Sequence, residues 1–100
     1  MAEHFNSLTP RESELISMLA EEAAEIVQIC MKIQRHGMYS YHPDDEKKIG
    51  NIFLLEEEIT DFLAVRRMML ASGYLSDNRH QIQDTIDKKM RYMHHFGDPS

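Results

Sequence analysis

The sequence predicts an all-α fold with two long helices and a shorter third one. Apolar side chains recur at helical spacing in two long stretches, capping residues precede the expected helices, and no segment alternates apolar and polar residues as a half-buried strand does. With 100 residues, 42% of them apolar and 28% charged, the chain has room for one core. We therefore expect a single domain over residues 1–100, with its core at about 8–95 and short tails.

The first helix is expected at residues 10–36. Thr9, Pro10 and Glu12 combine a capping box with proline at the first helical position, and Gly37 marks the end. The apolar side chains of this helix form more than one stripe, which indicates packing on more than one side. Cys30, the single cysteine of the chain, lies among these apolar residues, and we expect it in the core.

The second helix is expected at about 45–72. Pro43 disfavours helix in the loop before it, and Asp44 or Asp45 is suited to cap its first turn. Gly73 is the expected C-terminal stop. This helix is also apolar over much of its surface.

A third helix is expected from a cap at Ser76 to about residue 95. Its apolar side chains fall on one face and are Ile82, Ile86, Met90 and Met93. Two long antiparallel helices pack as a bundle, and this thinner helix leaves apolar surface uncovered. We therefore expect the bundle to be completed by oligomerisation, as a homodimer or a homotetramer.

The composition excludes several classes of partner. A net charge of −6 argues against a nucleic-acid polymer or an anionic membrane, since both require a basic surface. The apolar stretches are too short for a membrane span, and the N-terminus has no signal-peptide pattern. A single cysteine suits a reducing compartment. We expect a cytoplasmic protein.

The negative charge is concentrated in two clusters. Without the six acids of these clusters, 11 acids would remain against 11 bases; they are Glu21, Glu22, Glu25, Glu57, Glu58 and Asp61. Their neighbours four residues away are apolar or acidic, so the usual stabilising pairs with Lys or Arg are missing. Carboxylates that stay ionised within apolar stripes need cations, and a divalent metal meets that need.

The acids form Glu-x-x-Glu in the first helix and Glu-x-x-Asp in the second. Each pair projects from one helix face, so two facing helices would bring four carboxylates together. All-oxygen ligands suit Mg²⁺, with Mn²⁺ as the alternative. A di-iron site is the chemical competitor, but it requires Glu-x-x-His on two helices, which this sequence lacks. The other alternative is a solvated acidic face without a metal.

These motifs resemble those of the MazG-like all-α nucleoside triphosphate pyrophosphohydrolases. The matching segments are Leu19 to Ile26 and Leu55 to Leu63, and the resemblance extends over about residues 8–95. The stretches 32–37 and 41–44 resemble compact phage-encoded members in particular. Thr60 departs from the glycine of many members, and the spacing of 32 residues between the motifs is at the long end. Neither departure removes a ligand.

The resemblance implies hydrolysis of a nucleoside triphosphate between its α- and β-phosphates. Glu22, Glu25, Glu58 and Asp61 would be the Mg²⁺ ligands. Glu21 or Glu57 would be an auxiliary ligand or the base that activates water, and we count Glu22 with them among the candidate catalytic residues. The substrate alternatives are dGTP, cleaved by the branch found in phages that replace adenine by 2-aminoadenine, dUTP or dCTP, phosphoribosyl-ATP, and dNTPs in general.

Several side chains outside the clusters are candidates for substrate binding. Lys32 and Arg35 are the preferred pair for the distal phosphates, and the further candidates are Lys48, Asn51, Lys89 and Tyr92. The competing function is that of a non-catalytic helical interaction or regulatory protein. Such a protein would be expected to have lost part of the carboxylate pairs, and here all four positions are intact.

Overall fold

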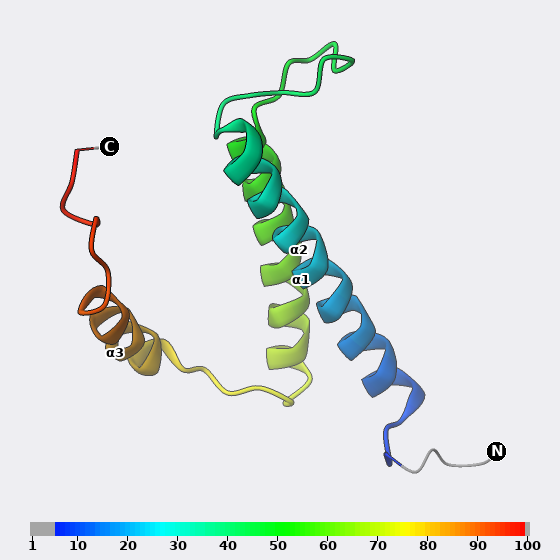
Figure 1. Ribbon diagram of the computed structural model, residues 1–100. Coiled ribbons are helices and arrows are strands. Elements are labelled where there is room, and N and C mark those ends of the chain that lie inside the picture. Colours follow the sequence, from blue (N-terminus) through cyan, green and yellow to red (C-terminus); the bar gives the residue numbers. More distant parts are fainter. Residues whose placement is uncertain (1–5, 100) are drawn as a thin grey trace.

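The computed structural model describes residues 6–99, and this part of the chain forms three α-helices and no strand (Figure 1). They are α1 (Pro10–His36), α2 (Asn51–Ala71) and α3 (Arg79–Met90). The predicted all-α class is confirmed. Helices α1 and α2 pack against each other as an antiparallel hairpin, and α3 lies apart from them.

Helix α1 has the bounds that the sequence predicts, because local signals define both of its ends. The Thr9 hydroxyl accepts a hydrogen bond from the Glu12 amide at 3.1 Å, and the Glu12 carboxylate accepts one from the Thr9 amide at 2.9 Å. These two bonds complete the capping box. At the other end, the Gly37 amide donates to the Ile33 carbonyl at 2.7 Å.

Helix α2 begins at Asn51, so the prediction of a start near residue 45 is wrong. Asp45 does not cap a helix; its carboxylate accepts hydrogen bonds from the amides of Lys47 and Ile49 and closes a turn. Lys48 within this turn has φ 54°, which is incompatible with a continuing right-handed helix.

The first turn of α2 is capped by backbone carbonyl groups that lie before the loop 41–49 in the sequence. The amides of Asn51 and Ile52 donate to the carbonyls of Ser40 and Met38, at 2.9 and 2.8 Å. The Asn51 side chain is 1% exposed, and its Nδ2 donates to the Gly37 carbonyl at 3.1 Å. Gly50 allows a close approach here, because a Cβ at this position would lie 3.3 Å from Cα and the carbonyl oxygen of Tyr39, a tight contact. We call residues 37–40 and 50–52 the helix junction.

Helix α2 ends at Ala71, one residue before the predicted end, in a Schellman motif. The amide of Gly73 donates to the Leu70 carbonyl and that of Tyr74 to the Met69 carbonyl, at 3.1 and 3.0 Å. Gly73 has φ 82°, which glycine adopts at little cost, so it is the stop that the sequence indicates.

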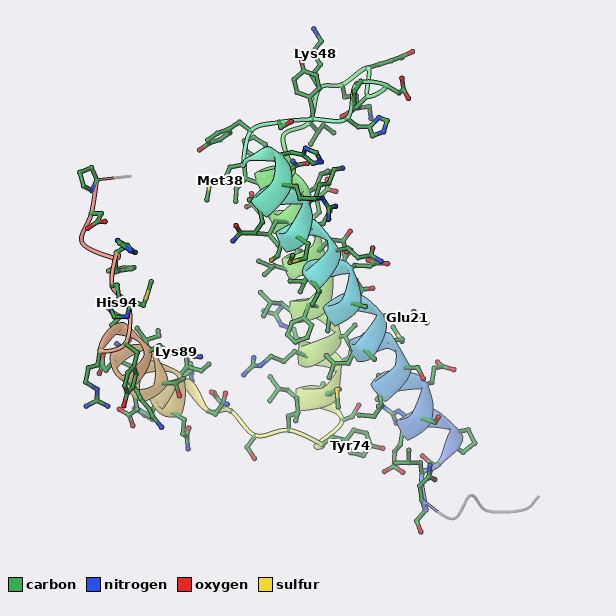
Figure 2. All side chains as sticks on the ribbon, viewed as in Figure 1. Glu21, Met38, Lys48, Tyr74, Lys89 and His94 are labelled. Atoms are coloured by element: carbon green, nitrogen blue, oxygen red, sulfur yellow. The ribbon has the colours of Figure 1, made fainter. Side chains whose placement is uncertain are left out.

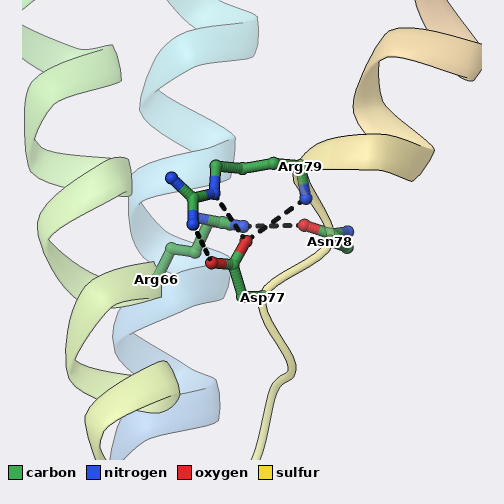
Figure 3. Close-up of polar contacts among 4 residues, drawn as sticks. All are labelled: Arg66, Asp77, Asn78 and Arg79. Atoms are coloured by element: carbon green, nitrogen blue, oxygen red, sulfur yellow. Dashed lines mark hydrogen bonds and ion pairs between the residues drawn. The ribbon is translucent and has the colours of Figure 1, made fainter.

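Helix α3 is shorter than predicted, because it starts three residues after Ser76 and ends at Met90. The residues before it make other contacts (Figure 3): the Asp77 carboxylate accepts hydrogen bonds from the amide and Nε of Arg79, and Arg66 Nη2 donates to Asn78 Oδ1 at 2.9 Å. These bonds fix the start of α3 at Arg79. The chain turns away from helical geometry after Arg91.

The hairpin has a small core. Within residues 6–99 the buried apolar side chains are Leu15, Val65 and Met69. Arg11 Nη2 donates to Ser72 Oγ at 2.8 Å and ties the start of α1 to the end of α2. Cys30 is exposed, so its predicted place in the core is wrong; it lies on a flank of α1 that α2 does not cover.

The single chain exposes more surface than its size requires. Its accessible area is 8,789 Å², whereas a compact protein of 11.7 kDa exposes about 5,900 Å². The radius of gyration is 17.8 Å against about 13 Å for a compact domain of this length. Within residues 6–99, the structure contains no helix with the length and apolar character needed to span a membrane.

Candidate metal centre

Three carboxylates meet where α1 and α2 face each other. Glu22 of α1 and Glu58 and Asp61 of α2 each offer an oxygen, and these oxygens lie within 4.8 Å of one another. Glu22 follows buried Leu15 by seven residues, and Glu58 precedes buried Val65 by seven. Seven residues are about two helical turns, so both glutamates lie on the sides through which the helices pack. The sequence thus places two acids inside the hairpin contact.

Glu25 is the fourth predicted ligand and does not belong to this group of three. Its carboxyl group interacts with those of Glu22 and Glu58 and raises the pKa of both. Glu25 and Asp61 are exposed, whereas Glu22 and Glu58 are half-buried. The structure therefore brings three of the four predicted ligands, Glu22, Glu58 and Asp61, within 4.8 Å of one another, and Glu25 lies close enough to raise the pKa of Glu22 and Glu58.

Two oxygens at the centre have no hydrogen-bond partner. They are Oε2 of Glu22 and Oε2 of Glu58, and both atoms are buried. The ion pairs found in residues 6–99 join His42 to Asp44, Arg79 to Asp77 and His95 to Asp98, so no basic side chain balances these acids there. Buried polar atoms without a partner call for an explanation, and a cation held between the helices would supply one.

The crowding of the acids changes their protonation. The hydrogen bond with Glu25, burial and the charges of the neighbouring carboxylates raise the pKa of Glu58 to about 7. Burial, followed by the charges of Glu25 and Asp61, raises the pKa of Glu22 above its ordinary value. The centre therefore retains a proton near neutral pH when no cation is bound.

Stability without metal should decrease as the pH rises. The folded protein holds a proton on Glu58 that the unfolded chain, with an ordinary pKa of 4.5, releases at lower pH. The contribution of Glu58 to folding is therefore greatest below about pH 4.5 and is lost as the pH rises through about 7. We expect the metal-free protein to melt at a lower temperature at pH 8 than at pH 5.

Two variants distinguish the contribution of Glu58 from that of other groups that titrate between pH 5 and 8. Glu58→Gln should flatten the decrease between pH 5 and 8 when melting is followed by circular dichroism in the presence of a chelator. Glu14→Gln, at an exposed position of α1, should keep the full decrease. Equal pH dependence in the two variants would contradict the titration assigned to Glu58.

The donor set fits a hard cation. In the part of the chain that the structure describes, the group able to hold a metal consists of carboxylates alone and includes no histidine or cysteine. Oxygen ligands of this kind suit Mg²⁺ or Mn²⁺, whereas structural zinc sites use Cys and His. A helical di-iron site would add a histidine from each of two helices.

The remaining candidate catalytic acids flank the centre. Glu21 and Glu57 are exposed and stand next to Glu22 and Glu58 in the sequence. Glu21 projects on the side of the hairpin away from α3 (Figure 2), and its charge contributes to the raised pKa of Glu22. Both acids are open to solvent beside the centre.

The predicted substrate-binding residues lie at different places. Lys32 is half-buried on α1, seven residues or about 10 Å along the helix from Glu25, and Arg35 is exposed one turn further on. Lys48 is exposed in the turn before α2. Asn51 is fully buried in the helix junction, so its position supports a structural role and gives no support to substrate contact.

The structure does not bring the other two candidates to the carboxylates. Lys89 belongs to α3 and Tyr92 follows it, and α3 contacts neither helix of the hairpin. The three acids that meet in the structure are all among the four predicted ligands, but the sequence did not indicate the buried link made by Asn51. The only local signal for that link was the Gly50-Asn51 pair after the turn.

Comparison with protein-family models, with curated proteins and with solved structures finds no match to this chain.

Proposed function

We propose that this chain is a magnesium-dependent nucleotide pyrophosphohydrolase of the MazG-like type. It would cleave a nucleoside or deoxynucleoside triphosphate between the α- and β-phosphates, giving the monophosphate and pyrophosphate. The observation that carries the proposal is the meeting of Glu22, Glu58 and Asp61 within 4.8 Å, with two buried oxygens that lack partners. Mn²⁺ is the alternative cation.

Each residue of the centre has a role in this reaction. Bound Mg²⁺ would neutralise phosphate charge and lower the pKa of a water molecule. Glu22, Glu25, Glu58 and Asp61 would hold the cation, and Glu21 or Glu57, open to solvent beside them, would accept a proton from the attacking water. Lys32 is the basic side chain best placed to contact the distal phosphates. No protein nucleophile is needed, which agrees with a site made of carboxylates.

The substrate is best found by direct assay. The purified protein is incubated with each common NTP and dNTP and with phosphoribosyl-ATP in the presence of Mg²⁺, and the products are separated by anion exchange. We expect a monophosphate and pyrophosphate, with dGTP as the first choice of substrate and dUTP, dCTP or dNTPs in general as the alternatives. Release of single phosphates would contradict the proposed cleavage position.

The second candidate function is that of a non-catalytic helical interaction protein. The large exposed area of the chain favours it. It predicts no turnover of any nucleotide in the same assay. The four acids gathered between α1 and α2 favour the enzyme, since an interaction protein has no need for carboxylates with unpartnered oxygens.

We also propose that the protein is a homodimer or a homotetramer in the cytoplasm of a bacterium or of a phage's host. The chain exposes roughly 2,900 Å² more than a compact protein of 11.7 kDa. Obligate dimers commonly bury about 2,000 Å² or more in total, so covering a part of this excess on each chain is enough for a stable interface.

A further inference from the structure

Helix α3 has an apolar stripe that neither α1 nor α2 covers. Ile82, Ile86 and Met90 follow one another at four-residue intervals and are each 43% exposed. The stripe runs about 12 Å along one face of the helix. In Figure 1, α3 lies apart from the hairpin, and among the described residues it contacts neither α1 nor α2. An isolated helix of 12 residues is marginal in water, so α3 needs a packing partner.

Helix α2 has an apolar surface of matching kind on a side that α1 does not cover. Ile52, Leu55, Ile59 and Leu63 line a shallow groove together with Glu56 and Thr60. The groove extends over about 16 Å of the helix and so is long enough for the stripe of α3. By helical rotation, the groove centre lies roughly a third of a turn from the side that carries Glu58. A helix seated in the groove would therefore leave the metal centre open.

The polar contacts before α3 hold its start beside α2. Arg66 on α2 donates to Asn78, and Asp77 forms an ion pair with Arg79 at 3.0 Å (Figure 3). From this point α3 leads away from its own hairpin (Figure 1). Helix α3 is thus attached near the groove of its own chain and extends away from the hairpin.

The charges also complement each other. Helices α1 and α2 together contain nine acids and five bases, whereas residues 79–91 contain four bases and two acids. Glu56 lies on the edge of the groove, and Lys88, Lys89 and Arg91 are gathered at the end of α3. Opposite charges around an apolar contact favour packing of α3 against the α2 groove over packing between two copies of α3.

We propose that α3 is an exchanged arm: in a homodimer, its stripe of Ile82, Ile86 and Met90 packs into the α2 groove of the second copy, and the second copy returns the same contact. Such an exchange is symmetric and closes after two chains. It covers both unpartnered surfaces at once and reduces the excess exposed area of the single chain.

Disulfide trapping tests the exchange without any nucleotide. Ile59→Cys and Ile86→Cys are placed on separate full-length chains that carry Cys30→Ser, and the two chains are unfolded and refolded together before oxidation. Both positions are central in their surfaces, so either direction of α3 brings them together. We expect a disulfide between positions 59 and 86 of two different chains, identified by peptide mass.

The double variant on one chain shows which copy supplies the arm. With all three substitutions, half of the chains labelled with ¹⁵N and the same mixed refolding, exchange predicts disulfides between labelled and unlabelled peptides. Disulfides confined to one chain would show that α3 folds back on its own groove and would overturn the proposal. The absence of any 59–86 disulfide would overturn it as well.

A charge placed in the stripe provides a second measurement. Ile86→Asp should convert the dimer to a monomer at micromolar concentration in sedimentation velocity. Gln81→Asp introduces the same charge on the other side of α3 and should leave the dimer intact. A dimer that survives Ile86→Asp would overturn the exchange, whereas the nucleotidase proposal would stand, since neither experiment measures hydrolysis.

Discussion

Replacement of Glu58 by alanine is expected to lower kcat for pyrophosphate release by at least about a hundredfold. The Glu58 carboxylate has an oxygen within 4.8 Å of oxygens of Glu22 and Asp61, so its loss removes a ligand from the centre. The measurement is the initial rate of pyrophosphate formation at saturating substrate and Mg²⁺. The fold should be retained, because the substitution also relieves repulsion between acids.

The same loss is expected for alanine at Glu22, Glu25 or Asp61, since all four acids belong to one centre. Glu14→Gln removes an exposed carboxylate from the same helix as Glu22 and should leave the rate unchanged. Circular dichroism of each variant checks that the helices remain. Full activity of the Glu58→Ala protein would show that these four acids do not perform the reaction.

Magnesium is expected to raise the melting temperature by about 10–20 °C at a concentration of about one hundred times Kd. A ligand that binds only the folded state stabilises it by about 2.7 kcal/mol at that concentration, and each kcal/mol shifts a domain of this size by about 4–8 °C. The folded hairpin gathers the four carboxylates, and the unfolded chain separates them. Scanning calorimetry with and without MgCl₂ at pH 8 measures the shift.

The increase in melting temperature with Mg²⁺ should depend on the acids of the centre. Glu58→Gln is expected to lose most of the shift, and Glu14→Gln to keep it. An added monovalent salt of equal ionic strength controls for screening of the acidic surface. A melting curve that millimolar Mg²⁺ leaves unchanged would contradict a metal site between α1 and α2.

The sequence predicts a helix end correctly when the hydrogen bonds that cap the helix come from residues nearby in the sequence. The limits of α1 are of this kind, because Thr9 and Glu12 cap each other and Gly37 follows directly. The start of α2 is different: its first amides bond to carbonyls of Met38 and Ser40, more than ten residues earlier. The acidic turn at Asp45 has the composition of a helix start, so local signals favour the wrong residue.

The centre was predictable because helical periodicity determines it. Acids at i,i+3 on two antiparallel helices meet once both helices carry them on the packed side, as the seven-residue offsets to Leu15 and Val65 show. Lys89 and Tyr92 could not be placed in the same way. Their position depends on how α3 packs, and the single chain leaves α3 away from the hairpin.

The helix junction has a consequence for the evolution of this chain. The register of α1 against α2, and with it the meeting of Glu22 with Asp61, is fixed by Asn51 and by the amides that bond to Met38 and Ser40. Residues 41–49 form a loop, and these hydrogen bonds join the residues on either side of it. Insertions, deletions and exchanges of sequence there can accumulate without displacing the carboxylates. The long interval between the two acidic motifs is therefore a place where related chains can diverge in length while keeping the same centre.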